Sequence, residues 1–423
     1  MNSFYLIGIK GTGMAALASI LKDMGYEVTG SDVSFPYFTT QKLLDKNIPI
    51  FTFSVENIKD NKIYIASSVY NEDNIEVSEV KKRNLPFFYY HDFLEYFFKN
   101  KIGIAGSHGK TTTTSLTSHF FQKEKICSLV GDGTGFGRND YDYFIFEACE
   151  YKDHFLKYTF DTLVINNIDF DHPDYFQNIN SVINSFKMAS ERAKWIIVNF
   201  DDPNTKEIIH PNILTFGLNE GALIHGRIVN KYDNGYELEV KIKNNKYQYF
   251  LPFLGKYMIY NFLAALSVCY LYGLDLNLIQ EYLFTYKRPS RRMQEYMYYD
   301  NIVIDDYAHH PKEIKECLLE IKQKYPNKEL IVIFQPHTYS RTLVLENEFK
   351  DVFKNVNLYL ANTFTSSRET YNKELEKKVF QIFENAKPFK EKDIKNFKKL
   401  NNKVFLFLGA GNINRYIKKL IGM

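Results

Sequence analysis

The chain has 423 residues, more than one ordinary hydrophobic core accommodates, and this length predicts about three domains. The 53 basic and 50 acidic residues leave a net charge of only +3, so nothing global argues for a nucleic-acid partner. No run approaches the roughly 18 apolar residues of a membrane span, and no basic-then-apolar leader opens the sequence. The scattered cysteines form no Cys-x-x-Cys pair, which argues against disulfides and zinc. We therefore expect a cytoplasmic protein without a membrane partner.

Strand-like runs alternate with helical patterns along the chain, which is typical of α/β domains with mainly parallel sheets. In the first part we expect strands at 4–9, 62–66 and 85–89 and helices at 14–24 and 92–99. A new strand–loop–helix unit begins at Lys101, so the first domain is predicted to span residues 1–98, with a Rossmann-like fold.

The middle part is predicted to be a P-loop ATPase-like domain over residues 99–288. Its expected strands are 101–105, 143–147, 162–168 and 194–199, and its expected helices are 112–121, 261–272 and 277–286. Between residues 221 and 253 the pattern changes to polar alternation, which predicts a small antiparallel insertion in a mostly parallel sheet. A third unit, residues 289–423, has expected strands at 301–304, 329–334, 357–360 and 403–408 and is also predicted to be Rossmann-like.

The segment Gly106-Ser107-His108-Gly109-Lys110-Thr111 lies between an expected strand and an expected helix. Such a loop directs backbone N–H groups at a phosphate, and the helix adds the positive end of its dipole. Lys110 then bridges the outer phosphates of ATP, while the Thr111 hydroxyl ligates Mg²⁺. The strict P-loop pattern is not met, because Ile104 occupies the place of its first glycine. The structural alternative is a simple strand-to-helix turn. We call residues 106–112 the phosphate loop.

Two sets of polar residues follow expected strands downstream. Glu147 ends an apolar strand, where a second Mg²⁺-coordinating position is expected. Residues 167–174 place three carboxylates and His172 just past another strand. Ligands of open α/β sheets sit at these carboxyl ends, so His172 is a candidate metal ligand, with a polar turn as the alternative.

A first glycine turn, residues 11–14, opens the pattern Gly-x-Gly-x-x-Ala, which spans residues 11–16, and Asp32 ends the next strand. This is the fingerprint of a dinucleotide site, with the acid placed for a ribose hydroxyl. It supports a rival hypothesis, a nicotinamide-dependent oxidoreductase. The structural alternative is a tight turn that lets the helix pack closely on the strand, and it explains Gly13 but not the other residues of the pattern. Two phosphate-binding turns on separate domains more naturally bind two phosphorylated ligands, one of them ATP.

Several longer segments, in order along the chain, together resemble the Mur ligase family. They are Gly8-Ile9-Lys10-Gly11-Thr12-Gly13-Met14, the phosphate loop, Asn167-Ile168-Asp169-Phe170-Asp171-His172, Asp305-Asp306-Tyr307-Ala308-His309-His310-Pro311, Phe334-Gln335-Pro336-His337-Thr338-Tyr339-Ser340-Arg341-Thr342 and Leu408-Gly409-Ala410-Gly411. Gly131-Asp132-Gly133-Thr134-Gly135 and Glu147-Ala148-Cys149-Glu150-Tyr151 resemble a Gram-positive-like branch. The resemblance covers essentially the whole chain and is closest to the branch that adds L-alanine to UDP-N-acetylmuramate.

The resemblance implies a reaction. The lactyl carboxylate of UDP-N-acetylmuramate attacks the γ-phosphate of ATP, and the L-alanine amine attacks the resulting acyl phosphate through a tetrahedral intermediate. The implied products are UDP-N-acetylmuramoyl-L-alanine, ADP and phosphate. The implied cofactors are two Mg²⁺ ions, and the implied state is a monomer or weak homodimer. The step belongs to cytoplasmic synthesis of peptidoglycan precursors, and so to cell-wall biogenesis, cell shape and cell division.

The resemblance also assigns site residues. The residues implied for ATP are Gly106, Ser107, His108, Gly109, Lys110, Thr111, Thr112, Asn261, Arg292 and Asp306. Those implied for the UDP portion are Gly11, Thr12, Gly13, Met14, Asp32, Ser67 and Ser68. Catalytic roles fall to Lys110, Glu147 and His172, and metal ligation to Thr111, Glu147 and His172. The amino-acid end is expected at His309, His310, His337 and Arg341. Arg341 suits the L-alanine carboxylate because its planar fork makes bidentate pairs.

Some of these residues have plain structural alternatives. Arg292 is equally suited to a surface ion pair, and Asn261 to the start of a helix. Asp32 fits a strand-end turn. His309 and His310 are adjacent, so one of them is expected to pack while the other functions. We also expect the third domain to close on ATP.

The chain departs from the family pattern at five positions. Lys10 replaces a common glycine and Ser107 a common threonine, which backbone phosphate binding tolerates. Thr338 stands at a usual arginine position, and Asn412 at a usual aspartate position. Cys149 replaces an acid and is expected to be a small buried hydrophobe, with a reactive thiol as the alternative.

Three rival functions stay open from the sequence. The nearest is the recycling ligase that attaches a tripeptide to the same sugar nucleotide. The first glycine turn of that ligase usually has a sequence different from residues 11–14 of this chain. The nicotinamide-dependent oxidoreductase and a non-catalytic nucleotide-binding regulator come from other classes.

Overall fold

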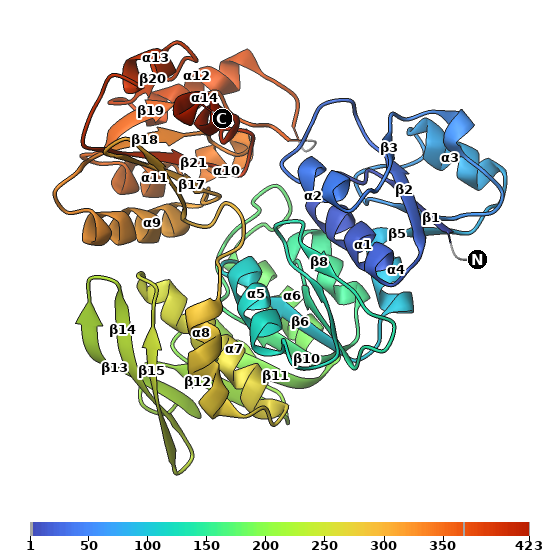
Figure 1. Cartoon of the computed structure of the whole chain (residues 1–423), viewed down its shortest axis with the longest axis horizontal. Coiled ribbons are helices and arrows are strands. Elements are labelled where there is room, and N and C mark those ends of the chain that lie inside the picture. Colours follow the sequence, from blue (N-terminus) through green and yellow to red (C-terminus); the bar gives the residue numbers. More distant parts are fainter. Residues whose placement is uncertain (1–2, 367–368, 423) are drawn as a thin grey trace.

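Three β-sheets, formed by successive parts of the chain, organise the protein (Figure 1). The computed structural model describes residues 3–366 and 369–422. The five-stranded N-terminal sheet has the order β3-β2-β1-β4-β5, and all of its pairs are parallel. Its strands are β1 (Ser3–Ile7), β2 (Glu27–Ser31), β3 (Ile50–Phe51), β4 (Ile63–Ala66) and β5 (Phe87–Tyr89). Its helices are α1 (Thr12–Asp23), α2 (Thr40–Asp45), α3 (Ile75–Lys82) and α4 (Tyr90–Phe97).

The central sheet has ten strands in the order β15-β14-β13-β12-β11-β10-β6-β9-β7-β8. The strands from β12 to β7 in this order are parallel. They are β6 (Lys101–Ala105), β7 (Ile126–Leu129), β9 (Tyr143–Glu147), β10 (Phe160–Ile165), β11 (Ala193–Asn199) and β12 (Ile213–Gly217), with β8 (Gly135–Phe136) antiparallel at one edge. The helices are α5 (Lys110–Phe120), α6 (Ile179–Ser190), α7 (Lys256–Leu271) and α8 (Ile279–Thr285).

The polar alternation after residue 221 forms the predicted antiparallel unit. It consists of β13 (Ile224–Tyr232), β14 (Gly235–Ile242) and β15 (Asn245–Leu251). The unit is not a separate sheet, because β13 pairs in parallel with β12 and so extends the central sheet.

The C-terminal sheet has the order β16-β17-β21-β18-β19-β20, parallel except for the β16–β17 hairpin. Its strands are β16 (Gln294–Tyr298), β17 (Asn301–Asp306), β18 (Glu329–Phe334), β19 (Asn357–Leu360), β20 (Lys387–Pro388) and β21 (Lys403–Leu408). The helices are α9 (Pro311–Lys324), α10 (Tyr339–Val344), α11 (Glu346–Val352), α12 (Lys373–Ile382), α13 (Asp393–Phe397) and α14 (Arg415–Ile421). The three-domain α/β fold predicted from the sequence is confirmed.

Some predicted boundaries are wrong. The strand expected at 162–168 ends at Ile165, because Asn166 begins a polar connection in which its side chain donates to Thr113. The helix expected at 261–272 begins at Lys256, so Asn261 lies inside α7 and does not start it. The first strand ends at Ile7, because Gly8 turns the chain with a φ of +83°.

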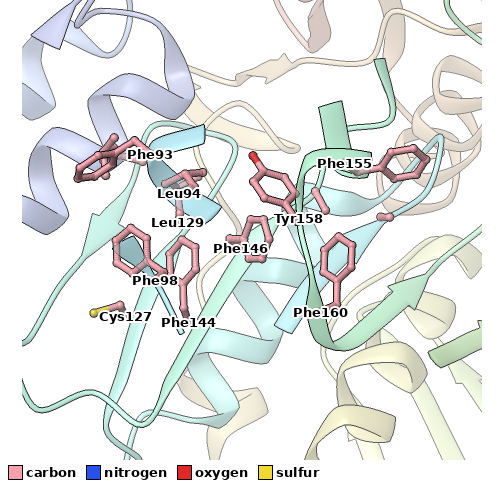
Figure 2. Packing of buried hydrophobic residues seen from close by; sticks show 14 of the residues in the cluster. Phe93, Leu94, Phe98, Cys127, Leu129, Phe144, Phe146, Phe155, Tyr158 and Phe160 are labelled. Atoms are coloured by element: carbon pink, nitrogen blue, oxygen red, sulfur yellow. The ribbon is translucent and has the colours of Figure 1, made fainter. Parts of the chain in front are cut away.

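An aromatic seam joins the N-terminal and central domains into one hydrophobic core (Figure 2). Phe93, Leu94 and Phe98, from α4 and its end, pack against residues of β9 and β10 in this core. The rings of Phe98 and Phe144 stack with centroids 3.8 Å apart, and Phe144 stacks on Phe146 at 4.8 Å. The C-terminal sheet instead has its own two clusters, one on each face.

Glycines let β8 and the residue that follows it lie directly on α1. A Cβ at Gly135 would stand 2.0 Å from the Ala16 carbonyl oxygen, and one at Gly137 would stand 2.3 Å from that of Ile20. The nearby Asp132 joins all three parts of the chain. Its carboxylate accepts from Lys42 Nζ at 2.9 Å and from the Ser290 N–H at 3.0 Å.

Among the described residues, no helix combines the length and the apolar character needed to cross a membrane.

The contact between Gly135 and α1 predicts a matched pair of glycine substitutions. Gly135→Ala forces a side chain against a backbone carbonyl that cannot rotate away, so we expect a loss of about 2–3 kcal/mol in stability. Gly25→Ala meets nothing within 4 Å and costs only its left-handed backbone, about 1 kcal/mol. Thermal unfolding of both variants checks this order. Equal midpoints would show that α1 is not held by this contact.

Candidate functional site

The phosphate loop crosses from β6 to α5 with a backbone that requires glycine. Gly106 has a φ of +136° and Gly109 a φ of +80°, and a Cβ on Gly109 would stand 2.5 Å from Asn261 Oδ1. Gly109 is the N-cap of α5 and leaves the helix without a side-chain cap. The first turn of α5 therefore presents backbone N–H groups and the positive helix end, which suit a phosphate.

The ammonium of Lys110 lies in the middle of the loop. It donates to the Gly106 carbonyl oxygen at 2.5 Å and to Glu150 Oε1 at 3.1 Å. Burial disfavours the charged lysine, but the buried carboxylate of Glu150 outweighs burial and raises the pKa of Lys110. Glu150 also faces His172, with Oε1 at 3.7 Å from Nε2. Lys110 and His172, which the sequence predicted separately, are thus joined through Glu150, a residue not predicted as a site residue.

Thr111 and Glu147 form a second pair beside Lys110. The Thr111 hydroxyl donates to Glu147 Oε2 at 2.8 Å. A Cβ at Gly131 would stand 1.9 Å from that same oxygen, so glycine is required there for Glu147 to reach Thr111.

No group of three His, Cys, Asp or Glu residues among those described is arranged to hold a metal ion. Mg²⁺ does not need such a cage, because it keeps waters and binds one or two protein oxygens together with substrate phosphates. The hydroxyl of Thr111 and the carboxylate of Glu147 fit that requirement.

A cavity opens between the phosphate loop, the start of α7 and the C-terminal domain. Residues implied for ATP line it from both sides, namely His108, Gly109, Thr112, Asn261, Arg292 and Asp306. Tyr257 and Tyr260 of α7 line it as well and were not predicted. Asn261 is buried and accepts from the Thr113 hydroxyl at 3.2 Å, so it ties α7 to α5 behind the phosphate loop.

Two acids and an arginine form the C-terminal side of this cavity. Asp306 accepts from the N–H groups of Ala308 and Met293, both at 2.7 Å. Burial raises its pKa to about 6 although Arg292 opposes the shift. Arg292 lies 3.9 Å from Glu313 and over the ring of Tyr307, so it faces the cavity and not the outer surface.

A cluster of charges around His108 closes the cavity between the two domains. His108 Nε2 lies 3.3 Å from Asp169 Oδ2, and its Nδ1 lies 3.6 Å from Glu313 Oε1. Lys312 of α9 also pairs with Asp169. Burial disfavours the charged imidazole, but Asp169 and Glu313 outweigh burial and raise the pKa of His108 to about 9.

The predicted amino-acid end is a second interdomain cluster. Arg341 is buried and donates from Nε to Asp171 Oδ1 at 2.8 Å, and its other nitrogens lie 3.0 Å from His337 Nδ1 and 3.4 Å from His172 Nδ1. The arginine predicted for the L-alanine carboxylate therefore pairs in this structure with Asp171 of the central domain.

The adjacent histidines point apart, as expected. The ring of His309 lies 5.3 Å from that of His337, on the Arg341 side, and burial followed by the Arg341 charge lowers its pKa to about 3. His310 caps α9 and lies 4.6 Å from the ring of His108, on the cavity side. Burial and then the His108 charge lower its pKa to about 4. Both imidazoles are therefore neutral at pH 7.

The first glycine turn is built separately, at the carboxyl ends of β1 and β4. Asp32 is buried and accepts from the Lys10 N–H at 2.7 Å, next to Gly11 and Thr12. Ser67 donates its N–H to the Ile7 carbonyl at 2.9 Å, and Ser68 beside it is exposed. A Cβ at Gly13 would stand 2.5 Å from the Tyr90 hydroxyl, so the packing alternative raised for Gly13 has a definite partner. Met14 is buried in the shared core below the turn.

Of the departures from the family pattern, Cys149 has a clear setting. Burial and then the Glu150 charge raise its pKa to about 12, so the thiol stays protonated at neutral pH. Thr338 is buried with a φ of +68°, and its carbonyl oxygen accepts a hydrogen bond from the Thr342 hydroxyl. Asn412 Oδ1 accepts from Gln335 Nε2 at 3.3 Å.

Asp169, Asp171, Glu313 and Glu150 were not predicted as site residues. Asp169, Asp171 and Glu150 lie within quoted motifs, but their burial against cations depends on contacts between segments far apart in the sequence.

The fold defines a class of three-domain α/β proteins in which the first two domains each carry a glycine loop at the end of a parallel strand. Comparison with known families gives the same result. Residues 3–101 match the model described as Mur ligase family, catalytic domain, residues 104–269 the Mur ligase middle domain, and residues 291–411 the Mur ligase, glutamate ligase domain. The chain therefore belongs to the Mur ligase family, whose members are ATP-dependent ligases.

Solved structures share the fold over the whole chain. UDP-N-acetylmuramate-alanine ligase MurC from Thermotoga maritima is 22% identical with a TM-score of 0.82, covering 99% of this chain and 98% of that one. A murein peptide ligase from Psychrobacter arcticus is 18% identical with a TM-score of 0.76, covering 100% and 98%. A pseudomurein peptide ligase type C from Methanothermus fervidus is 19% identical with a TM-score of 0.64, covering 100% and 99%.

The charge cluster at His108 predicts a pH-dependent interdomain contact. A folded pKa of about 9, against 6.5 in the unfolded chain, stabilises the folded state by an amount on the order of 3 kcal/mol. Because the folded pKa is raised, this stabilisation is fully present below pH 6.5 and is lost as the pH rises through 9.

We therefore expect the unfolding midpoint of His108→Gln to lie below that of the wild type at pH 6 and to converge with it by pH 10. Histidine-selective NMR titration measures the pKa directly. A ring that titrates at or below 6.5 would contradict the cluster as described.

Proposed function

We propose that this Mur ligase joins L-alanine to the lactyl carboxylate of UDP-N-acetylmuramate at the expense of ATP. The observation that carries the proposal is the placement of two different glycine loops on one fused N-terminal and central body. The phosphate loop lines the cavity that Asn261, Arg292 and Asp306 also line. The turn at residues 11–14 lies against Tyr90, on whose hydroxyl the charge of Glu147 acts. This arrangement supports ATP at the phosphate loop and the diphosphate of a sugar nucleotide at the first glycine turn, with the reactive ends of the two ligands meeting between them.

The chemistry proposed for this meeting point needs positioning and charge neutralisation more than covalent help. A carboxylate oxygen of the sugar nucleotide attacks the γ-phosphorus, and the bond from that phosphorus to the ADP oxygen breaks. Lys110 neutralises charge on the transferred phosphoryl group once its ammonium turns from Glu150 towards the phosphates. Thr111 and Glu147 would hold Mg²⁺, for which His172 is a further predicted ligand, and the ion would supply further neutralisation of the phosphate oxygens.

The second half of the reaction is proposed at the cluster around Arg341. The amine of L-alanine attacks the carbonyl carbon of the acyl phosphate, loses a proton, and phosphate leaves with the electrons of its C–O bond. His309, His337 and Arg341 come from the C-terminal domain and meet Asp171 and His172 here. Closing of the C-terminal domain therefore assembles this end of the site.

The second candidate is the ligase that attaches a peptide to the same sugar nucleotide, which the fold shared with the Psychrobacter enzyme supports. The Thermotoga alanine ligase matches with the higher TM-score, which favours the first candidate, whereas structures of both kinds of ligase reach 22% identity.

Substrate selection is predicted to separate the candidates. Purified protein with UDP-N-acetylmuramate, ATP and Mg²⁺ is expected to release phosphate when L-alanine is added, and not when the tripeptide is added. Phosphate release and mass spectrometry of the sugar nucleotide measure the outcome. Release only with the tripeptide supports the second candidate, and no release with either one rejects both.

Lys110 is predicted to serve ATP chemistry but not sugar-nucleotide binding. Lys110→Ala should lower kcat by at least about 10²–10³-fold, while calorimetric affinity for UDP-N-acetylmuramate stays within about threefold, because the two loops are separate. Lys194→Ala, an exposed lysine of the same domain (76% exposed side chain), is the control.

Removing Lys110 also leaves the buried Glu150 without its lysine, so the double variant with Glu150→Gln separates lost chemistry from lost stability. Equal loss of turnover and sugar-nucleotide binding in both variants would show that the loops do not serve separate ligands.

A further inference from the structure

The helix that joins the first two domains places a tyrosine between the two glycine loops. Tyr90 is the first residue of α4, immediately after β5. Contacts with the central domain fix this helix: His91 Nδ1 lies 2.5 Å from the Tyr158 hydroxyl, and Lys157 pairs with Asp92 at 2.7 Å. Further along, the Thr159 hydroxyl donates to Glu95 at 2.7 Å. The position of Tyr90 is therefore held by the central domain as much as by its own.

The hydroxyl of Tyr90 lies against the first glycine turn on one side. A Cβ on Gly13 would stand 2.5 Å from the hydroxyl oxygen and 2.7 Å from the ring carbon that carries it. The charge of Glu147, next to the phosphate loop, also acts on this hydroxyl. Burial, and then the charge of Glu147, raises the pKa of Tyr90, so the hydroxyl is a hydrogen-bond donor throughout the neutral range.

This donor has no partner within the protein as far as the chain is described. Three other tyrosine hydroxyls in this fold have protein partners: that of Tyr158 meets His91, that of Tyr257 donates to Glu320 and that of Tyr64 donates to the Lys59 carbonyl. No hydrogen bond joins the Tyr90 hydroxyl to any residue in 3–366 or 369–422, and its half-buried ring packs on the shared core. A half-buried tyrosine whose donor has no protein partner, and which lies between two ligand loops, is suited to a ligand.

We infer that the Tyr90 hydroxyl donates a hydrogen bond to the lactyl carboxylate of the bound sugar nucleotide. The inference rests on the proposed function. A carboxylate attached to a nucleotide at residues 11–14 and attacking a phosphate at residues 106–112 has to pass between Gly13 and Glu147, where this hydroxyl lies.

The hydroxyl contacts the carboxylate oxygen that does not attack phosphorus. That oxygen becomes the carbonyl oxygen of the acyl phosphate and carries the negative charge when the amine adds to the carbon. Tyr90 keeps its proton throughout, so it orients the carboxylate and then stabilises the oxyanion of the tetrahedral intermediate. Neither task involves a contact with ATP, so ATP binding does not depend on Tyr90.

Binding of two sugar nucleotides tests the inference without requiring turnover. UDP-N-acetylglucosamine has the same nucleotide and sugar but lacks the lactyl carboxylate. Tyr90→Phe removes only the hydroxyl, so it should weaken UDP-N-acetylmuramate binding about tenfold, as expected for a hydrogen bond to a charged group, and leave UDP-N-acetylglucosamine binding unchanged. Tyr89→Phe, the half-buried neighbour that ends β5, is the control and should alter neither affinity.

Kinetics supply the second measurement. In Tyr90→Phe, kcat should fall about 10²-fold while the affinity for ATP and the unfolding midpoint match the wild type. Affinity and kcat within threefold of the wild type would overturn the inference and leave the proposed function standing. Equal weakening for both sugar nucleotides would show that Tyr90 acts on the turn and not on the carboxylate. A wild-type protein that binds neither sugar nucleotide would reject the proposed function and this inference together.

Discussion

The aromatic seam between the N-terminal and central domains is the constraint on which the site depends. Stacking of Phe98 on Phe144, continued through Phe146, gives the two domains one apolar core in place of a hydrated interface. Two domains that share one close-packed interior move little relative to each other. The first glycine turn and the phosphate loop are therefore held on one rigid body, and the geometry between their ligands does not depend on a domain motion.

The C-terminal domain is attached by a different kind of contact. Its own clusters stay on its own sheet, and it meets the central domain through charges: His108 and Asp169 with residues of α9, and Asp171 with Arg341. Polar interfaces of this type favour relative domain motion. The same contacts lie on the ATP cavity and at the predicted amino-acid end. We therefore expect binding and release of ligands to be coupled to closing of this domain, with the fused pair as the fixed part.

Much of the fold was predictable because its signals are local. Strands such as Lys101–Ala105 and Tyr143–Glu147 were predicted to the residue, since buried parallel strands form continuous apolar runs that end at glycine or polar residues. Helix starts were predicted less well, because α7 begins after Gly255 with no side-chain cap to mark it. The antiparallel unit was predicted from its polar alternation, but its parallel pairing with β12 was not, because this alternation does not show which strand the unit joins.

The sequence by itself determined the family, the order of the three domains and the two glycine loops, because each is encoded by consecutive residues whose chemistry does not depend on distant parts of the chain. The tertiary structure alone decided the partners. It placed Glu150 between Lys110 and His172, paired Arg341 with Asp171, and brought Tyr90 against Gly13. These contacts join segments that lie far apart in the sequence, and their energies come from burial of charges and donors that are fully solvated in the unfolded chain. No local sequence pattern predicts these contacts.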